Sequence, residues 1–483
     1  MNKFFLILPA LFLVSGCTTS PTSGQSIFTG FVDTQQEAQL GSTEHANILK
    51  EFNGEADNAA LNQFVQRIGN KLTPYAERKD VTFKFTVLND DLVNAFAVPG
   101  GYIYITRGLL NLAQDESQVA AVLGHEMGHI NARHSAQQMS QSMMANLGLQ
   151  ALGIATGSNL ATQAGGVGAD LFIKKYSRAH ELEADALAVR YLSAAGYDPY
   201  ANTKFLAMLE ENTALERRMS GSVAGNDLSS FFATHPPTPE RVNRARVLAD
   251  QAQKPQNPIT NRDEYLRAID GTIYGDTAEQ GFTRGRDFIH PGLKIKFEVP
   301  QGFRIQNSEK QVVAVNTSGA TIIFDMGKGQ VDDPVDYITT TWAPNAATSN
   351  QEKITVNDFA GATASTSMLV NGTQKDAQMV ALSAGGGKFY RLVFLAPGGQ
   401  MGNYSADFRR TTYSLSGLSA QELKLASPNR IRLIKVKQGD TIQSLAAQMP
   451  VADYAAERFC LLNGLKMGEA LTPGMTVKTV ATF

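Results

Sequence analysis

Apolar residues recur at helical spacing through much of the first half of the chain. Residues 36–77 are rich in Ala, Leu, Glu and Gln and predict two helices. Later stretches show helical patterns as well: 115–142, 177–195, 199–219 and 238–253. Residues 81–106 instead contain VTFKFTVL and YIYIT, two strand-like runs separated by turn-forming residues. We therefore expect residues 36–255 to form a helix-rich α+β domain.

The pattern changes after Pro255 and Pro258. Residues 256–283 are charged and read as a linker, and residues 284–420 alternate strand runs such as KIKFEV and ATIIFDM with Gly-rich turns. That alternation predicts a second domain, α+β or β-rich. Residues 431–482 predict a strand, two helices and a closing strand, which make a small βααβ unit. The chain is therefore expected to be multidomain, and it shows no long-period repeat.

The N-terminus has the pattern of an export signal. Lys3 supplies a positive charge, and the apolar run at 4–14 is too short for a membrane-spanning helix, which needs about 20 residues. The run ends in VSGC, which resembles the bacterial lipobox, where the cysteine is lipidated and becomes the first residue of the mature protein. We expect residues 1–17 to be a lipoprotein signal peptide, Cys17 to carry lipid, and residues 18–35 to form a flexible tether. An ordinary signal peptide with a chance cysteine is the alternative.

Composition limits the classes of function. The 483 residues, 43% of them hydrophobic, suit roughly three globular domains. Lys and Arg number 43 against 45 Asp and Glu, which argues against a nucleic-acid binder that relies on bulk charge. The two cysteines, Cys17 and Cys460, exclude a disulfide-rich scaffold and an all-cysteine zinc site. With Cys17 assigned to lipid, Cys460 is expected to be a buried small hydrophobe.

The chemistry of the first domain centres on one motif, His125-Glu126-Met127-Gly128-His129. Residues four apart share a helix face, so His125 and His129 can hold one ion together. Glu126 lies beside the first histidine, with its carboxylate near the open side of the ion. This is the signature of zinc metalloproteases. A helix with two surface histidines is the alternative, which the apolar run AAVL before the motif disfavours.

A zinc site of this kind needs a third protein ligand. Glu181 is the candidate, and His180 competes with it. Asp185, one helical turn after Glu181, is placed to accept a hydrogen bond from the far nitrogen of a ligating histidine. In the expected mechanism, zinc makes its bound water more acidic and Glu126 moves a proton from that water to the leaving amine.

Three further motifs accompany the histidine motif in a fixed order: NAFAVPGG at 94–101, SRxxExxAD at 177–185 and THPxxxxR at 234–241. Over residues 36–250 this order resembles the HtpX/BepA-like and CAAX-prenyl-protease zinc metallopeptidases. The resemblance implies a gluzincin fold with one zinc ion per chain and a sheet whose edge strand holds an extended substrate. The implied substrate-binding residues are Asn94, Ala95, Phe96, Gly100 and Gly101. The chain lacks the spanning helices of membrane-embedded relatives and looks like the periplasmic lipoprotein branch.

Several residues near the motif keep open roles at this point. His235 is a candidate to donate to the tetrahedral oxyanion or to occupy the open zinc position, with a purely structural role as the alternative. Arg241 is expected to anchor its segment through a buried carboxylate. Glu183 is expected to be solvated or structural, and His134 should point away from the metal on a continuous helix. The segment 139–172 is either a mobile lid or a pair of core helices.

The βααβ unit resembles a LysM module, which binds N-acetylglucosamine polymers such as peptidoglycan. Thr441 caps its first helix, and Gly474 provides a turn before its last strand. The candidate glycan contacts are Gly439, Asp440, Thr441 and Asn463.

Together these patterns predict a zinc metalloendopeptidase that is anchored in the outer membrane, faces the periplasm and hydrolyses misfolded or mislocalised envelope proteins. Thr18 after the lipobox cysteine, in place of Asp, favours the outer membrane. Expected partners are polypeptide substrates, peptidoglycan, the membrane and the outer-membrane assembly machinery, with no nucleic acid. One alternative is a non-proteolytic assembly factor, chaperone or wall tether with a structural or self-blocked zinc site. The other is a peptidoglycan hydrolase.

Overall fold

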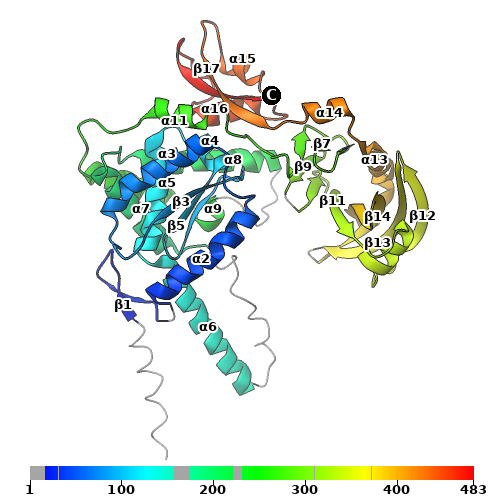
Figure 1. Cartoon of the computed structure of the whole chain (residues 1–483), viewed down its shortest axis with the longest axis horizontal. Coiled ribbons are helices and arrows are strands. Elements are labelled where there is room, and N and C mark those ends of the chain that lie inside the picture. The colour runs from blue at the N-terminus through cyan, green and yellow to red at the C-terminus, as the bar shows by residue number, and fades with distance from the viewer. Residues whose placement is uncertain are drawn as a thin grey trace, which may run out of the picture.

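The computed structural model describes residues 17–30, 32–156, 175–220, 231–235, 238–308, 310–370 and 372–482. The signal peptide up to residue 16 and the part of the proposed lid at 157–172 lie outside these ranges. Figure 1 shows a helix-rich domain, a β-rich domain beside it and a small C-terminal unit. No helix in the described ranges is long and apolar enough to span a bilayer.

The first domain is built mainly from helices. They are α2 (Thr34–Glu51), α3 (Ala59–Leu72), the 3-10 turn η1 (Thr73–Tyr75), α4 (Arg107–Leu112), α5 (Glu116–Asn131), α6 (His134–Thr156), α7 (Arg178–Ala194), α8 (Ala201–Ser220), α9 (Phe231–Thr234) and α10 (Pro239–Gln251). Helices α5, α7 and α10 each begin at a side-chain N-cap. Asp115, Ser177 and Thr238 accept backbone N–H bonds at their respective starts. The expected run 115–142 is two helices rather than one, and α6 extends away from the domain (Figure 1).

A three-stranded sheet packs against these helices in the order β3 (Lys84–Leu88), β5 (Tyr102–Thr106), β4 (Ala95–Val98). Strand β5 lies in the middle, parallel to β3 and antiparallel to β4, so β3 and β4 are both edge strands. The outer side of β3 is partly covered, because Ala56 N donates to Val87 O at 2.8 Å and Asn89 N donates to Gly54 O at 2.9 Å. The side chains of β4 are committed to the core, as in Phe96, which is 2% exposed and stacks on Tyr104 at 5.0 Å. Only the backbone of β4 is therefore left to bind a further strand.

Gly41 sets how closely α2 approaches the turn between β4 and β5. A Cβ at this position would lie 2.0 Å from the Pro99 carbonyl oxygen. Ala in place of Gly normally stabilises a helix interior by about 1 kcal/mol. Here we expect Gly41→Ala to destabilise the domain by about 1–3 kcal/mol, because a backbone carbonyl must move. Calorimetric unfolding measures the effect, and exposed Ser42→Ala on the same helix is the control. A stabilised Gly41→Ala variant would contradict this packing.

The segment expected to be a flexible tether is instead a short hairpin. Strand β1 (Cys17–Thr19) pairs antiparallel with β2 (Ser26–Phe28), and the hydroxyls of Thr18 and Thr29 lie 2.8 Å apart. Hydrogen bonds between polar side chains stabilise this hairpin, so the pattern of apolar residues in the sequence does not predict it.

The β-rich domain follows as an antiparallel structure. Its larger sheet has the order β12-β13-β14-β15-β11-β10-β9 and its smaller sheet the order β16-β8-β7-β6. The strands are β6 (Phe282–Arg284), β7 (Asp287–His290), β8 (Ile295–Glu298), β9 (Arg304–Asn307), β10 (Val312–Val315), β11 (Thr321–Lys328), β12 (Ser349–Val356), β13 (Phe359–Val370), β14 (Thr373–Gly385), β15 (Lys388–Pro397) and β16 (Ser416–Gly417). The helical segments are α12 (Pro334–Asp336), the π-helical η4 (Tyr337–Trp342), α13 (Met401–Ser414) and α14 (Ala420–Leu425). Trp342 lies over the Arg391 guanidinium at 5.0 Å, which is a packing contact.

The expected linker at 256–283 is only partly a linker. It contains α11 (Arg262–Ile269), in which Asp263, Glu264 and Arg267 are exposed while Tyr265 is fully buried. Residues 271–274 then pair with β17 (Asn429–Lys435): Gly271 N donates to Ile431 O at 2.9 Å, and Tyr274 N donates to Asn429 O at 2.8 Å. The charge of this stretch concealed one apolar helix face, which is why it resembled a linker.

The C-terminal unit has the expected βααβ order. After β17 come α15 (Ile442–Ala446), α16 (Ala455–Asn463) and β18 (Thr476–Thr482), which pairs antiparallel with β17. It is fixed to the first domain by Lys478, which is fully buried. The Lys478 Nζ donates to the carbonyls of Asn111 and Ala113 at 2.8 and 2.6 Å, just before the helix that carries the histidine motif. The first domain and the C-terminal unit therefore share one packed interface.

Candidate metal centre

Three segments bring four metal-ligating side chains together. Helix α5 carries His125 and His129, α7 carries Glu181, and His235 follows α9. A close helix contact makes this possible: a Cβ on Gly128 would lie 3.2 Å from the Ala184 Cα on α7. The glycine inside the histidine motif thus lets α7 approach α5 closely enough for Glu181 to reach both histidines.

The ligand atoms of this cluster are spaced as around one ion. The Nε2 atoms of His125 and His129 lie 3.1 Å apart, and His235 Nδ1 lies 3.3 Å from His125 Nε2. Glu181 Oε1 lies 2.9 Å from His235 Nδ1 and 3.5 Å from His129 Nε2. Bonds of about 2.0–2.1 Å in a tetrahedron place ligand atoms roughly 3.3 Å apart, so the four side chains fit zinc.

The chemistry of the donors also fits a cation. Burial holds the pKa of His129 well below its ordinary value, so its imidazole is neutral and offers a lone pair. All four side chains are at most 2% exposed. A cation between Glu181 and the facing imidazole nitrogens offsets the cost of burying them so close together.

A second layer of side chains holds the ligands. Asp185 Oδ1 lies 3.0 Å from His125 Nδ1, the ring nitrogen that faces away from the cluster. Without a cation, burial acts to lower the pKa of His125, but hydrogen bonds to Asp185 and Glu181 outweigh it and raise the pKa to about 9. A cation that binds at His125 Nε2 would displace that proton. Arg241, 1% exposed, donates to both Asp185 oxygens at 2.8 and 3.0 Å and pairs with Glu181 at 2.7 Å. It also donates to the His235 carbonyl at 3.2 Å.

Glu126 lies beside the cluster without belonging to it. Its side chain is fully buried, and its Oε1 lies 3.6 Å from His235 Nε2. Within the described part of the chain, neither Glu126 oxygen nor His235 Nε2 has a hydrogen-bond partner. Burial raises the pKa of Glu126, which makes the carboxylate a stronger base. Three buried polar atoms without a hydrogen-bond partner therefore lie next to the ligand cluster.

His134 lies differently from the sequence expectation. Helix α5 ends at Asn131, Arg133 has a positive φ of 58°, and α6 begins at His134. The break turns the His134 ring back, so that its Nδ1 lies 2.9 Å from His129 Nδ1. The prediction assumed one continuous helix and was wrong about this direction. Nothing in the residue types around Arg133 marks the break, because arginine rarely adopts a positive φ.

The remaining candidates near the histidine motif contact the cluster indirectly. His180, the competing ligand, stacks on His134 with ring centroids 4.2 Å apart and is outside the group of four. Glu183 accepts from His134 at 3.3 Å, so it is structural and half-buried.

The edge-strand residues divide into two groups. Ala95 and Phe96 lie on β4, and Asn94 precedes it with backbone bonds to Thr106. Gly100 and Gly101 form the turn after β4, with φ of 84° and 97°. A Cβ on Gly100 would lie 2.9 Å from the Ala38 Cα, and one on Gly101 would lie 2.4 Å from the Thr82 oxygen. Tight packing of the turn therefore explains these glycines.

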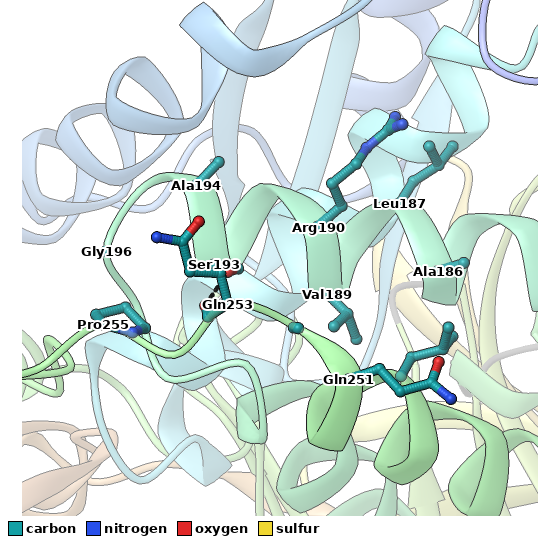
Figure 2. A pocket seen from close by; sticks show the side chains of 12 residues that line it. Ala186, Leu187, Val189, Arg190, Ser193, Ala194, Gly196, Gln251, Gln253 and Pro255 are labelled. Carbon is teal, nitrogen blue, oxygen red and sulfur yellow. Dashed lines mark hydrogen bonds between the residues drawn. The ribbon is translucent and has the colours of Figure 1, made fainter.

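A groove of about 730 Å³ lies elsewhere, between α7 and the end of α10 (Figure 2). Its lining includes Val189, Arg190 and Ser193 of α7 and Gln253, whose carbonyl accepts from the Ser193 hydroxyl. None of the residues that line it belongs to the metal cluster. The groove is thus separate from the chemistry of the site.

Comparison with known proteins assigns the family. The family model described as peptidase family M48 matches residues 59–249. Metalloprotease LoiP of Escherichia coli (strain K12) is 32% identical over 195 residues, which are 38% of this chain and 69% of LoiP. The chain belongs to peptidase family M48. M48 membership and the His-His-Glu-His cluster confirm the predicted zinc metallopeptidase class and its zinc cofactor.

Other similarities of this M48 chain are partial. The beta-barrel assembly-enhancing protease of Yersinia pestis is 30% identical over 217 residues, 43% of this chain and 42% of that protein. The chain therefore spans less than half the length of this relative. The solution structure of cyanobacterial PsbP (CyanoP) from Synechocystis sp. PCC 6803 aligns with 31% of this chain and 93% of CyanoP, at 12% identity. Its TM-score of 0.22 is too low to carry an inference.

Proposed function

We propose that the protein is a zinc-dependent endopeptidase of the bacterial envelope. In this proposal it is anchored in the outer membrane through lipid on Cys17, faces the periplasm and hydrolyses misfolded or mislocalised envelope polypeptides. The observation that carries the proposal is the buried carboxylate of Glu126, whose oxygens have no hydrogen-bond partner among the described residues, beside a cluster that fits zinc. A base next to a Lewis acid is the arrangement that peptide hydrolysis requires.

Each polar group has a role in the proposed reaction. Zinc bound by His125, His129 and Glu181 supplies Lewis-acid chemistry, which polarises a carbonyl and makes a water more acidic. Glu126 accepts the proton of the attacking water and delivers it to the leaving amine. His235 Nε2, 3.6 Å from Glu126 Oε1, is close enough to the reaction space to donate to a developing oxyanion.

The backbone of β4 supports binding of an extended polypeptide. Thr106 N, at the end of β5, donates to Asn94 O at 3.0 Å, so Asn94 and Thr106 face each other as a hydrogen-bonded pair. Antiparallel pairs alternate, and Ala95 and Ala97 therefore direct their N–H and C=O groups away from β5. A substrate strand would pair with these groups and run past the metal helix.

One observation favours a self-blocked resting state as a second candidate. His235 lies within the ligand cluster, and the cluster is almost fully buried. If His235 acts as a fourth protein ligand, it takes the position that a water needs, and substrate access then requires His235 to leave. If it never leaves, the chain is a non-proteolytic assembly factor or chaperone with a structural zinc site.

The C-terminal unit supports a wall-binding role. Its βααβ order suits a LysM-like module, and Gly439 and Thr441 are exposed at the start of α15 with Asp440 partly exposed between them. Asn463 is committed to the Lys478 backbone, at 2.7 and 2.8 Å, so the glycan surface that we propose is centred on residues 439–441. The name of the Yersinia pestis relative supports association with barrel assembly machinery as a further proposal.

Zinc removal tests the proposed activity. Wild-type protein loaded with one zinc per chain is expected to cleave casein, to lose cleavage when a chelator removes the metal, and to regain it when zinc is restored. The reason is that Glu126 alone cannot polarise the peptide carbonyl. Metal analysis of each sample is the matched control. Cleavage that persists in verified zinc-free protein would contradict the peptidase, and release of muropeptides from peptidoglycan would favour a wall hydrolase.

A further inference from the structure

A chain of hydrogen bonds connects the N-terminal hairpin to a zinc ligand. Thr22, in the loop between β1 and β2, donates its hydroxyl to Glu183 Oε1 at 2.6 Å. The other oxygen of Glu183 lies 3.3 Å from His134 Nε2. His134 Nδ1 lies 2.9 Å from Nδ1 of His129. Four side chains from three separate parts of the sequence thus form one continuous path that ends on a metal ligand.

The ligand role of His129 fixes the direction of every bond along this path. His129 faces the cluster through Nε2, so its Nδ1 carries the proton and donates to His134 Nδ1. His134 then carries its own proton on Nε2 and donates to Glu183. The Thr22 hydroxyl donates to the second carboxylate oxygen. Each donor therefore has an acceptor, and Glu183 is the shared acceptor that orients both His134 and Thr22.

A second set of contacts holds the same N-terminal segment on the metal helix. Arg133, directly before His134, donates to the Val32 carbonyl at 2.8 Å and to the Thr29 hydroxyl at 3.3 Å. Its Nε donates to Glu37 at 3.1 Å, at the start of α2. The positive φ of Arg133 that redirects His134 therefore also aims its guanidinium at the hairpin. The His134 path and the Arg133 contacts therefore both attach the N-terminal segment at the junction between α5 and α6.

We propose that Thr22, Glu183 and His134 are positioning residues for the zinc ligand His129, and that the N-terminal hairpin is thereby part of the metal centre. Outer partners of metal-bound histidines fix the ring orientation and raise ligand basicity. This positioning role rests on two parts of the proposed function, the zinc site and the lipid anchor on Cys17, and it does not require that the protein cleaves peptides. Since the hairpin begins at Cys17, the proposed lipid attachment lies on the same short segment as Thr22. Removal or displacement of that segment from the first domain would loosen the zinc.

The test is the zinc affinity of the full-length mature chain, measured by competition with a chelator of known affinity. Glu183→Gln keeps the shape but replaces an acceptor oxygen with an N–H₂ donor. It is expected to weaken zinc binding about 10-fold, within the range for lost outer partners of metal ligands. Thr22→Val is expected to weaken it by a smaller factor. Thr19→Val, at an exposed position of β1, is the matched control and should leave the affinity unchanged.

A double variant separates positioning from hairpin docking. If Thr22 acts through Glu183, the Thr22→Val, Glu183→Gln double variant should bind zinc no more weakly than Glu183→Gln alone. Zinc affinities of both single variants within twofold of wild type, or independent losses that multiply in the double variant, would overturn the proposal. Equal loss of thermal stability with unchanged zinc affinity would also overturn it, since that is a purely structural role. These experiments measure zinc affinity and not casein cleavage. The positioning role can therefore be confirmed or refuted even if the protein proves not to cleave peptides.

Discussion

Glu126→Gln is expected to bind zinc as tightly as wild type and to lose peptide hydrolysis by about 10²–10⁴-fold. Glu126 stands outside the group of four ligands, so its replacement removes no donor from the ion. The amide has the same shape but cannot accept a proton from water. It also replaces a buried carboxylate that lacks a hydrogen-bond partner in the described part of the chain, so the folded state should not lose stability.

Casein cleavage and self-cleavage, each with the zinc content of the sample, measure this effect. Glu211→Gln, on the exposed side of α8, is the matched control and should cleave like wild type. Equal proteolysis by zinc-loaded wild type and Glu126→Gln would refute the proposed peptidase. Loss of muropeptide release in the variant, together with unchanged proteolysis, would instead assign the site to the peptidoglycan hydrolase reading.

Arg241→Met is expected to destabilise the zinc-free domain by about 3–5 kcal/mol, because it removes the positive charge that pairs with two buried carboxylates. Arg241 bridges Asp185 and Glu181, which are both at most 2% exposed. The guanidinium holds the pKa of Asp185 below its ordinary value against the opposing effect of burial. Bound zinc supplies positive charge to Glu181, so the loss should be smaller in the zinc-loaded protein.

Calorimetry of both forms measures this difference. Arg244→Met on the exposed face of α10 removes the same charge and should change stability by less than about 0.5 kcal/mol. A destabilisation that is equal with and without zinc would show that Arg241 supports the fold independently of the metal. No measurable destabilisation would contradict the buried ion pairs themselves.

The parts of the site that follow one regular helix could be predicted from sequence. His125, His129 and Glu126 are fixed by the helical repeat, and Asp185 by one turn from Glu181. His235 lies far along the chain, and its choice between donor and ligand depends on how α9 packs. Residue spacing carries no such information, so the sequence leaves both roles of His235 open and cannot predict its short distances to Glu181 and His125.

The missed features share one physical cause. Arg133 adopts a conformation that its residue type disfavours, and tertiary contacts with Thr29, Val32 and Glu37 hold it there. The N-terminal hairpin likewise depends on polar bonds between distant residues, such as Thr22 with Glu183. Local propensity and apolar periodicity describe neighbours along the chain, so they predict the helices well and long-range polar contacts poorly.

The pairing of residues 271–274 with β17 means that the order of domains along the chain is not their order in space. The polypeptide leaves the peptidase body after Tyr274 and returns at Asn429, two residues whose backbones are hydrogen bonded. The β-rich domain is therefore an inserted domain, and an insertion of this kind can be added or removed at one point of the chain without disturbing the structure around it. An expression clone that stops at residue 275 would omit β18 and Lys478 and uncover the Tyr265 face. A clone that excises residues 276–428 and joins the ends with a short turn would keep the peptidase and its C-terminal unit together.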